Sequence, residues 1–188
     1  MQDLDIRAKA VIDRIIKVDY AGELGAKNIY AAQIKHEANL ENRAKLLEML
    51  SDELAHLEYF TGIGKQEQVR PSILHGVMNV GAKALGFVSG KAGFHSMMAA
   101  TVGVEEVIQE HYAMQIQELQ ELIEILPESS RYYKITRELH SKILQFIDEE
   151  KKHHDSGLEY CNNSFRYDIS YKISKYVSKI AIKLVSIT

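Results

Sequence analysis

The sequence predicts an all-α fold, a helical bundle, on three observations. Long stretches carry apolar residues at intervals of three and four among charged ones, as amphipathic helices do. Only two prolines occur, and both fall between apparent helical segments. The chain is 46% hydrophobic and rich in Ala, Leu, Ile, Glu and Lys, which favours helices. At 188 residues, we expect a single domain over 1–188 with its bundle core at about 4–160.

The chain divides into five helical segments and one irregular stretch. A polar break near Asn39 separates the first two helices. The break at Pro127-Glu128-Ser129-Ser130 separates the third from the fourth and offers serine N-caps. Glycines punctuate residues 62–94, which predicts a long, partly helical crossover between the second and third helices. The helices are expected at about 4–36, from Asn39 to 60, at 95–126, from the proline break to 160, and at 168–187.

Charge and cysteine content limit the environment and the partners. A net charge of −3 gives no footprint for a nucleic acid, so none is expected as a partner. The single cysteine, Cys161, excludes an intrachain disulfide and indicates a reducing compartment, where it is an incidental free thiol. Residues 1–9 are polar and charged, unlike a signal peptide, and no uncharged apolar run reaches the roughly 18 to 20 residues that span a bilayer. We therefore expect a cytoplasmic protein.

Two Glu-x-x-His spacings point to metal ligands. Glu53 precedes His56 by three residues, and Glu150 precedes His153 in the same way, both in helix-forming segments. Residues i and i+3 share a helix face, so each pair can direct a carboxylate and an imidazole at one point. An acidic residue directly precedes each of these glutamates. Such spacings also arise by chance. Whether these pairs are metal ligands therefore depends on the residues that face them in the bundle.

An internal repeat selects two further glutamates. Glu23 and Glu105 each begin the pattern Glu-x6-Tyr-Ala-x-Gln, with Tyr30 in the first copy and Tyr112 in the second. Seven residues are close to two helical turns, so each tyrosine lies on the same face as its glutamate, one layer away. The repeat also selects Glu105 rather than its neighbour Glu106.

The four glutamates are expected at matching heights in the bundle. Counted from the break near Asn39, Glu23 and Glu53 lie about 24 Å and about 21 Å along their helices. Counted from the proline break, Glu105 and Glu150 lie about 33 Å and about 35 Å away. In two antiparallel helices joined by a turn, Glu23 therefore lies opposite Glu53, and Glu105 lies opposite Glu150.

A solvated charge is the ordinary interpretation of an acid, but these four lie on or beside apolar stripes. A carboxylate there costs several kcal/mol unless a cation or a proton compensates it. Four carboxylates and two imidazoles carry enough charge for two divalent ions, and favour iron or manganese over zinc or Cu(I). One Glu from each of two helices, with Glu-x-x-His from each of two others, is the ligand pattern of ferritin-like di-iron bundles. For His111, His140 and His154, the spacing leaves open an ordinary imidazole or a hydrogen-bond partner of the ligands.

Several motifs occur in a characteristic order along the chain. They are Val18-Asp19-Tyr20-Ala21-Gly22-Glu23-Leu24-Gly25-Ala26, Ile29-Tyr30, Glu53 to His56, Arg70-Pro71, Ala100 to Ile108 with His111-Tyr112, and Asp148 to Leu158. Together these motifs resemble, in the correct order, those of the demethoxyubiquinone hydroxylase family. The resemblance covers about Ala10 to Leu158, and Tyr20 stands where that family has His, outside the expected ligands.

The resemblance implies a ferritin-like di-iron monooxygenase of ubiquinone biosynthesis. It would hydroxylate the ring of a polyprenylated methoxy-methyl-benzoquinol, with two iron ions as cofactor, O₂ as co-substrate and two electrons from an external donor of unknown identity. His111 and Tyr112, which match the family's His-Tyr pair, are candidates for proton or electron delivery. By the same likeness Glu23 and Glu105 are terminal ligands, Glu53 and Glu150 bridge the irons, and His56 and His153 complete one site each.

The last helix has the pattern of a membrane-interface helix. Four lysines form one stripe, apolar residues cover another face, and residues 169–188 contain no acid. The crossover, about 73–94, is expected to line a lipid-facing tunnel or to enter the interface; the alternative is that both segments merely pack on the bundle. The stripe consists of Lys172, Lys175, Lys179 and Lys183, and the apolar face of Ile173, Tyr176, Val177, Ile180 and Leu184.

With the resemblance, this pattern implies a peripheral protein at the cytoplasmic face of the cell inner membrane. Its partners would be the polyprenyl benzoquinol, membrane lipid and other ubiquinone-biosynthesis proteins, and a homo-oligomer is compatible with the sequence. Three other functions compete. The first is iron oxidation and storage, which the ligand set alone would permit. The second is a non-catalytic, lipid-binding scaffold of quinone synthesis, which would use the crossover and the last helix. Hydroxylation of a tRNA base is disfavoured by the lack of a basic surface.

Overall fold

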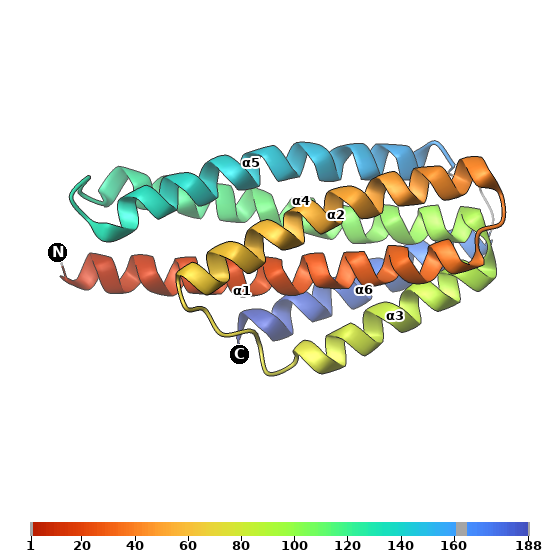
Figure 1. The fold of residues 1–188 in the computed structure, drawn as a ribbon, viewed down its shortest axis with the longest axis horizontal. Helices are drawn as coiled ribbons and strands as arrows, with labels where there is room; N and C mark the ends of the chain where they lie inside the picture. Colours follow the sequence, from red (N-terminus) through yellow and green to blue (C-terminus); the bar gives the residue numbers. More distant parts are fainter. Residues whose placement is uncertain (1, 161–164, 188) are drawn as a thin grey trace.

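The computed structural model describes residues 2–160 and 165–187, which form an all-α, ferritin-like bundle as predicted (Figure 1). These described residues contain no strand. Cys161 lies outside them. The elements are α1 (Gln2–Gln33), the short 3₁₀ helix η1 (Ile34–His36), α2 (Leu40–Gln66), α3 (His75–Ala92), α4 (Phe94–Ile125), α5 (Arg131–Leu158) and α6 (Phe165–Ser186).

Four long helices form the bundle and two shorter ones cover it. α1 packs against α2 and α4 against α5, while α3 lies mainly on α1 and α6 mainly on α4 (Figure 1). Both predicted breaks are confirmed as helix starts. The side chain of Asn39 accepts hydrogen bonds from the first amides of α2, and that of Ser130 accepts one from the first turn of α5.

The crossover is partly helical, as expected, but it begins later than the glycines indicated. α2 continues past the predicted end near 60 to Gln66, through Gly62 and Gly64. Glycine lowers helix propensity by only about 1 kcal/mol, which burial of the flanking Phe60 and Ile63 can offset. Within α3, a Cβ on Gly86 would lie 2.9 Å from the Cβ of Ala32, so this glycine permits α3 to approach α1 closely.

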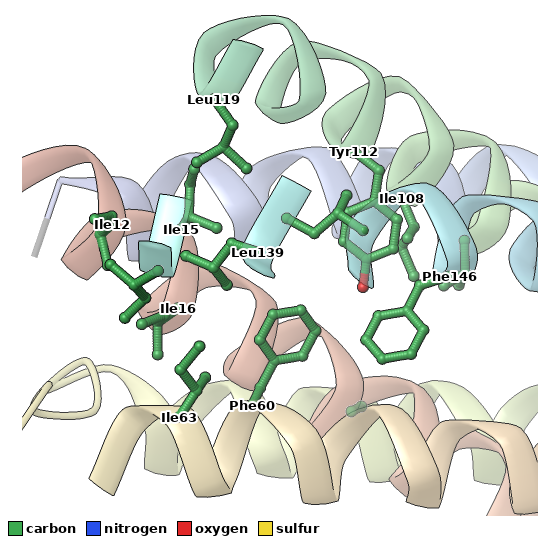
Figure 2. Close-up of a cluster of buried hydrophobic side chains, with 14 of the residues drawn as sticks. Ile12, Ile15, Ile16, Phe60, Ile63, Ile108, Tyr112, Leu119, Leu139 and Phe146 are labelled. Carbon is green, nitrogen blue, oxygen red and sulfur yellow. The ribbon is translucent and has the colours of Figure 1, made fainter. Parts of the chain in front are cut away.

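The largest apolar cluster fills the bundle around Phe60 and Phe146, whose ring centroids lie 5.7 Å apart (Figure 2). Phe60 on α2 and Leu139 on α5 are both fully buried. The cluster includes Tyr112 of α4, and Phe146 also contacts the imidazole of His56, with centroids 4.1 Å apart. The aromatic core is therefore continuous with the predicted ligands.

α6 is attached to α4 by close packing and by ion pairs. A Cβ on Gly103 would collide with the backbone of Tyr171, so only glycine allows this approach. Lys175 lies 2.7 Å from Glu106, and Lys179 pairs with Glu110 of α4 at 3.0 Å. Two of the four lysines in the expected basic stripe therefore make ion pairs with the bundle.

The apolar face expected on α6 is exposed. Tyr176 is 72% exposed, and α3 adds Val77 and Val80, which are 74% and 69% exposed. Among the described residues, no helix combines the length and the apolar character needed to cross a membrane.

Candidate metal centre

The six predicted ligands meet inside the four-helix bundle. α1 and α4 each contribute one glutamate, while α2 and α5 each contribute one Glu-x-x-His pair. None of the six is more than 4% exposed. They are Glu23, Glu53, His56, Glu105, Glu150 and His153.

Within residues 2–160 and 165–187, these side chains form two overlapping groups of four that could each hold a metal ion. In each group, one ligand atom per residue lies within 4.8 Å of all the others. Glu53 and Glu150 belong to both groups, so each can contact two metal positions at once. One group is Glu23, Glu53, His56 and Glu150; the other is Glu53, Glu105, Glu150 and His153.

The buried polar atoms that lack partners supply the donor set for such ions. A buried group without a hydrogen bond costs about 1 to 3 kcal/mol, and more if charged, so its presence calls for an explanation. Among the described residues, the buried atoms without hydrogen bonds include both carboxylate oxygens of Glu53 and Glu150, Oε2 of Glu23 and Glu105, and Nδ1 of His56 and His153. Two glutamates thus offer two atoms each and two offer one, which is the division between shared and terminal ligands.

The cluster electrostatically favours positive charge. Burial, and then the charge of Glu150, raise the pKa values of Glu53 and Glu105 well above the usual range. Burial opposes ionisation of Glu150 too, but the adjacent imidazoles of His153 and His56 lower its pKa to about 2. Although burial disfavours their charged forms, the adjacent carboxylates raise the pKa of His56 to about 12 and that of His153 to about 9. Divalent cations would supply this charge directly.

Two outer carboxylates hold the imidazoles in place, and they do so crosswise. Nε2 of His56 lies 2.6 Å from Glu149 of α5, and Nε2 of His153 lies 3.1 Å from Asp52 of α2. The acid that precedes each Glu-x-x-His pair therefore binds the histidine of the other pair. Because Nε2 is engaged outside, Nδ1 faces the cluster, as a metal-ligating imidazole requires.

We expect Glu149→Gln to weaken metal binding by roughly 10- to 100-fold, because the amide cannot hold the Nε2 proton of His56 as a carboxylate does. Anaerobic titration with Fe²⁺ measures the change. Asp148→Asn is the matched control, since Asp148 is exposed and immediately precedes Glu149. Equal affinities for the two variants would contradict the orienting role of Glu149.

The two repeat tyrosines also bond crosswise. Tyr30 of α1 donates to Glu105 of α4 at 2.8 Å, and Tyr112 of α4 donates to Glu23 of α1. Burial, followed by the charges of these glutamates, raises the pKa of both hydroxyls well above the usual range. Each tyrosine therefore contacts the glutamate of the other repeat copy, which its position on a shared face did not predict.

His111 does not belong to either group, but it contacts a polar system beside Glu23. The amide nitrogen of Gln115 lies 2.7 Å from Asp19 and 2.8 Å from Nε2 of His111. Burial, opposed in part by this hydrogen bond, raises the pKa of Asp19 well above its usual range. The sequence interpretation missed Asp19; the indication was its position four residues before Glu23, on the same helix face.

Three other residues singled out in the sequence lie outside both groups. His154 contacts the exposed carboxylate of Asp155 at 3.3 Å, and His140 is partly buried on α5. Tyr20 stacks on His75 of α3, with ring centroids 5.8 Å apart. None of the three contributes a ligand atom to the cluster.

An apolar cavity of about 230 Å³ lies between α1, α3, α4 and α6. Its inner wall includes Gly22, Ile29, Val104 and Ile108, which also line small spaces beside the ligands Glu23 and Glu105. One layer of small and apolar residues therefore separates the cavity from the metal cluster. Its outer wall includes residues of α3 and α6, the helices with the exposed apolar faces.

The chain is similar in sequence to known proteins. A family profile described as ubiquinone biosynthesis protein COQ7 matches residues 10–185. The NADPH-dependent 3-demethoxyubiquinone 3-hydroxylase, mitochondrial, of Rattus norvegicus is 40% identical over 157 residues, which cover 84% of this chain and 68% of the relative. The protein of the same name in Homo sapiens is 39% identical over the same shares of both chains. The 3-demethoxyubiquinol 3-hydroxylase of Rhodospirillum rubrum is 34% identical over 152 residues, or 79% of this chain and 64% of the relative. The chain therefore belongs to the COQ7 family of ubiquinone biosynthesis proteins.

Proposed function

We propose that this protein is a di-iron monooxygenase that hydroxylates the ring of a polyprenylated demethoxyubiquinol. The observation that carries the proposal is the pair of ligand groups that share Glu53 and Glu150. The names of the relatives supply the substrate class and the reaction. In the balanced reaction, the ring C–H, O₂, two electrons and two protons give the ring C–OH and one water.

Two iron ions fit the cluster in charge and in donor type. Four carboxylates balance two Fe²⁺ ions, and a mixed oxygen and imidazole set suits iron. Glu53 and Glu150 would bridge the ions; Glu23 with His56 would hold one, and Glu105 with His153 the other. The iron pair would activate O₂ so that one oxygen atom enters the ring and the other becomes water.

The apolar cavity is the binding space that we propose for the quinol. Its lining of small and apolar residues suits a methylated ring and the first isoprene units. The inner wall at Ile29, Val104 and Ile108 would bring the ring next to the ligands, while the tail leaves between α3 and α6. Exclusion of water by this wall would protect the reaction from solvent.

We assign electron and proton delivery to the polar residues beside Glu23. The rat and human relatives are named NADPH-dependent, and we propose NADPH as the electron donor of this chain. Tyr112, which donates to Glu23, and its neighbour His111 are proposed to take part in proton or electron delivery.

The exposed apolar faces of α3 and α6 support attachment to a membrane surface. A polyprenyl tail resides in the bilayer, so the cavity mouth between these helices should face lipid. Lys172 and Lys183 are exposed on α6 and would contact anionic headgroups. We propose a peripheral protein at the inner membrane, where other ubiquinone-biosynthesis proteins would also reach it.

We expect the double variant Val80→Glu/Tyr176→Glu to lose most of its binding to vesicles of phosphatidylcholine and phosphatidylglycerol, because each carboxylate would have to enter an apolar interface. Flotation measures the bound fraction. Leu144→Glu on α5 is the matched control, since Leu144 is 43% exposed but far from the cavity lining. Equal flotation of the double variant and wild type would contradict the proposed orientation. Deleting α6 is a poorer test because its contacts with α4 also hold the bundle.

Reconstitution separates hydroxylation from storage. The apoprotein is titrated anaerobically with Fe²⁺, then mixed with a short-chain demethoxyubiquinol, NADPH and O₂, and the quinol is analysed by mass spectrometry. We expect binding of two Fe²⁺ per chain and a product that is heavier by one oxygen atom. Accumulation of more than two oxidised irons per chain without product would instead indicate storage. Quinol binding without iron binding would indicate a scaffold.

A further inference from the structure

A second, much smaller cavity lies beside Glu23 and shares Gly22 and Ile108 with the wall of the apolar cavity. It has a volume of about 20 Å³, which is room for one water molecule. Its polar wall consists of Asp19, Glu23, His111 and Tyr112. Among the described residues, Oδ2 of Asp19 and Oε2 of Glu23 are buried without a hydrogen-bond partner. The cavity therefore offers a water molecule several polar partners beside the expected ligand Glu23.

The internal repeat supplies a control within the same chain. A shift of 82 residues relates Glu23 to Glu105 and Tyr30 to Tyr112. Beside Glu105 lies a space with an equivalent lining, and each of its residues has a counterpart in the polar cavity. The corresponding pairs are Ala26 and Ile108, Ile29 and His111, Tyr30 and Tyr112, Asp19 and Thr101, Gly22 and Val104, and Glu23 and Glu105.

The two spaces differ at the positions that matter for proton transfer. Thr101 stands in place of Asp19, and Ile29 stands in place of His111. The space beside Glu105 has a volume of about 0 Å³, so a water molecule does not fit. The helices beside Glu105 pack without an acid or an imidazole at these positions. Helix packing alone therefore does not require Asp19 and His111 at the matching positions beside Glu23.

Gln115 joins the two polar side chains of the cavity. Its amide donates to Oδ1 of Asp19 and to Nε2 of His111, and these two acceptor atoms lie 3.9 Å apart. Its repeat counterpart, Gln33, instead donates to Ser89 of α3 at 3.0 Å. Among the described residues, only the repeat copy that contains Gln115 therefore has a glutamine that bonds both an acid and an imidazole.

His111 connects this cavity with the protein surface. Its side chain is 16% exposed, whereas that of Asp19 is 1% exposed. Burial, and then the charge of Arg14, lower the pKa of His111 to about 4. Its imidazole is therefore neutral near pH 7, so one ring nitrogen can accept a proton while the other releases one.

We propose that Asp19 is a proton-relay residue, which passes protons from His111 through the cavity water to the side of the cluster formed by Glu23 and Tyr112. This role rests on the proposed function, since hydroxylation consumes two protons per oxygen atom inserted. Asp19 accepts a proton on one carboxylate oxygen and releases one from the other, so its own charge is unchanged after transfer. Protons would enter beside Glu23, while the quinol approaches through the apolar cavity.

The test compares Asp19→Asn with Thr101→Val, which alters the matched position in the other repeat copy. Asparagine keeps an oxygen that can accept from Gln115, but it cannot relay a proton. We expect both variants to retain the melting temperature and the Fe²⁺ stoichiometry of wild type. Hydroxylation by Asp19→Asn should fall roughly 10- to 100-fold, with a larger solvent deuterium isotope effect. Thr101→Val should stay within about twofold of wild type in rate.

Other outcomes overturn the relay. If Asp19→Asn keeps the rate and isotope effect of wild type, protons use another path. If it loses iron, or loses rate with no change in the isotope effect, Asp19 is structural. If wild type forms no hydroxylated quinol, the proposed function fails, but the relay is still tested, because oxidation of bound Fe²⁺ by O₂ also consumes protons. The relay then predicts slower oxidation in Asp19→Asn than in Thr101→Val, and equal rates contradict it.

Discussion

Replacing Glu150 by alanine is expected to eliminate the two-metal centre and the hydroxylation together. Glu150 belongs to both ligand groups, and both of its oxygens lack hydrogen bonds among the described residues. Its loss removes one donor from each metal position and leaves the two histidines without their shared partner. We expect fewer than two bound Fe²⁺ per chain and a loss of product of about 100-fold or more. This loss is larger than the one expected for Glu149, which contacts a ligand but does not itself bind the metal. Anaerobic Fe²⁺ titration and mass spectrometry of the quinol measure both.

Two further variants make this result interpretable. Glu150→Gln keeps the volume of the side chain, so it separates the loss of charge from the loss of packing. Glu121→Ala removes an exposed glutamate of α4 and should behave as wild type. Hydroxylation at the wild-type rate by Glu150→Gln would contradict a bridging role for this residue.

Phe60→Ala is expected to destabilise the fold by about 3 to 5 kcal/mol, because it leaves a large cavity in the main apolar cluster. Phe60 is fully buried, and its ring contacts that of Phe146 (Figure 2). Phe146 in turn packs on His56. For a chain of this length the melting temperature should fall by roughly 10 °C. Thermal unfolding followed by circular dichroism measures the change.

The same variant also tests how far the core supports the metal centre. Because Phe146 would lose its neighbour, we expect weaker Fe²⁺ binding even at temperatures where the variant is folded. Leu144→Ala removes an apolar side chain of α5 that is 43% exposed, and should change the melting temperature little. A Phe60→Ala protein as stable as Leu144→Ala would contradict the assignment of Phe60 to the core.

The sequence was sufficient to predict the elements that depend on periodicity. Helical spacing placed Glu53 beside His56 and Glu150 beside His153, and the repeat chose Glu105 over Glu106. In the structure, Glu105 joins the cluster while Glu106 pairs with Lys175 of α6. Periodicity succeeds here because these residues are related along one helix or by one repeat.

Contacts between helices were harder to predict. Helical periodicity does not show how α6 is rotated on α4, so Lys175 and Lys179 were expected in a basic stripe rather than in ion pairs with the bundle. The crosswise bonds of Tyr30 and Tyr112 also depend on the facing helix. Asp19 was overlooked because its partner Gln115 lies on another helix, 96 residues away.

The two copies of the repeat differ in the side chains around their glutamates, although both are helices with the same residue spacing. The crosswise bonds from Asp52 and Glu149 hold the histidines alike on both sides. The layer beside Glu23 contains Asp19 and His111 and holds space for water, whereas the layer beside Glu105 contains Thr101 and Ile29 at the matching positions and has no room for water. This asymmetry is consistent with proton delivery beside Glu23 only.

The most direct test of the account is a single-turnover reaction of the wild-type protein with ¹⁸O₂. The protein is loaded anaerobically with two Fe²⁺ per chain, supplied with a short-chain demethoxyubiquinol and NADPH, and exposed to the labelled gas. If the protein is a di-iron monooxygenase, the product carries one ¹⁸O atom in its new ring hydroxyl. Oxidised iron with unmodified quinol, or a hydroxyl oxygen derived from water, would contradict it.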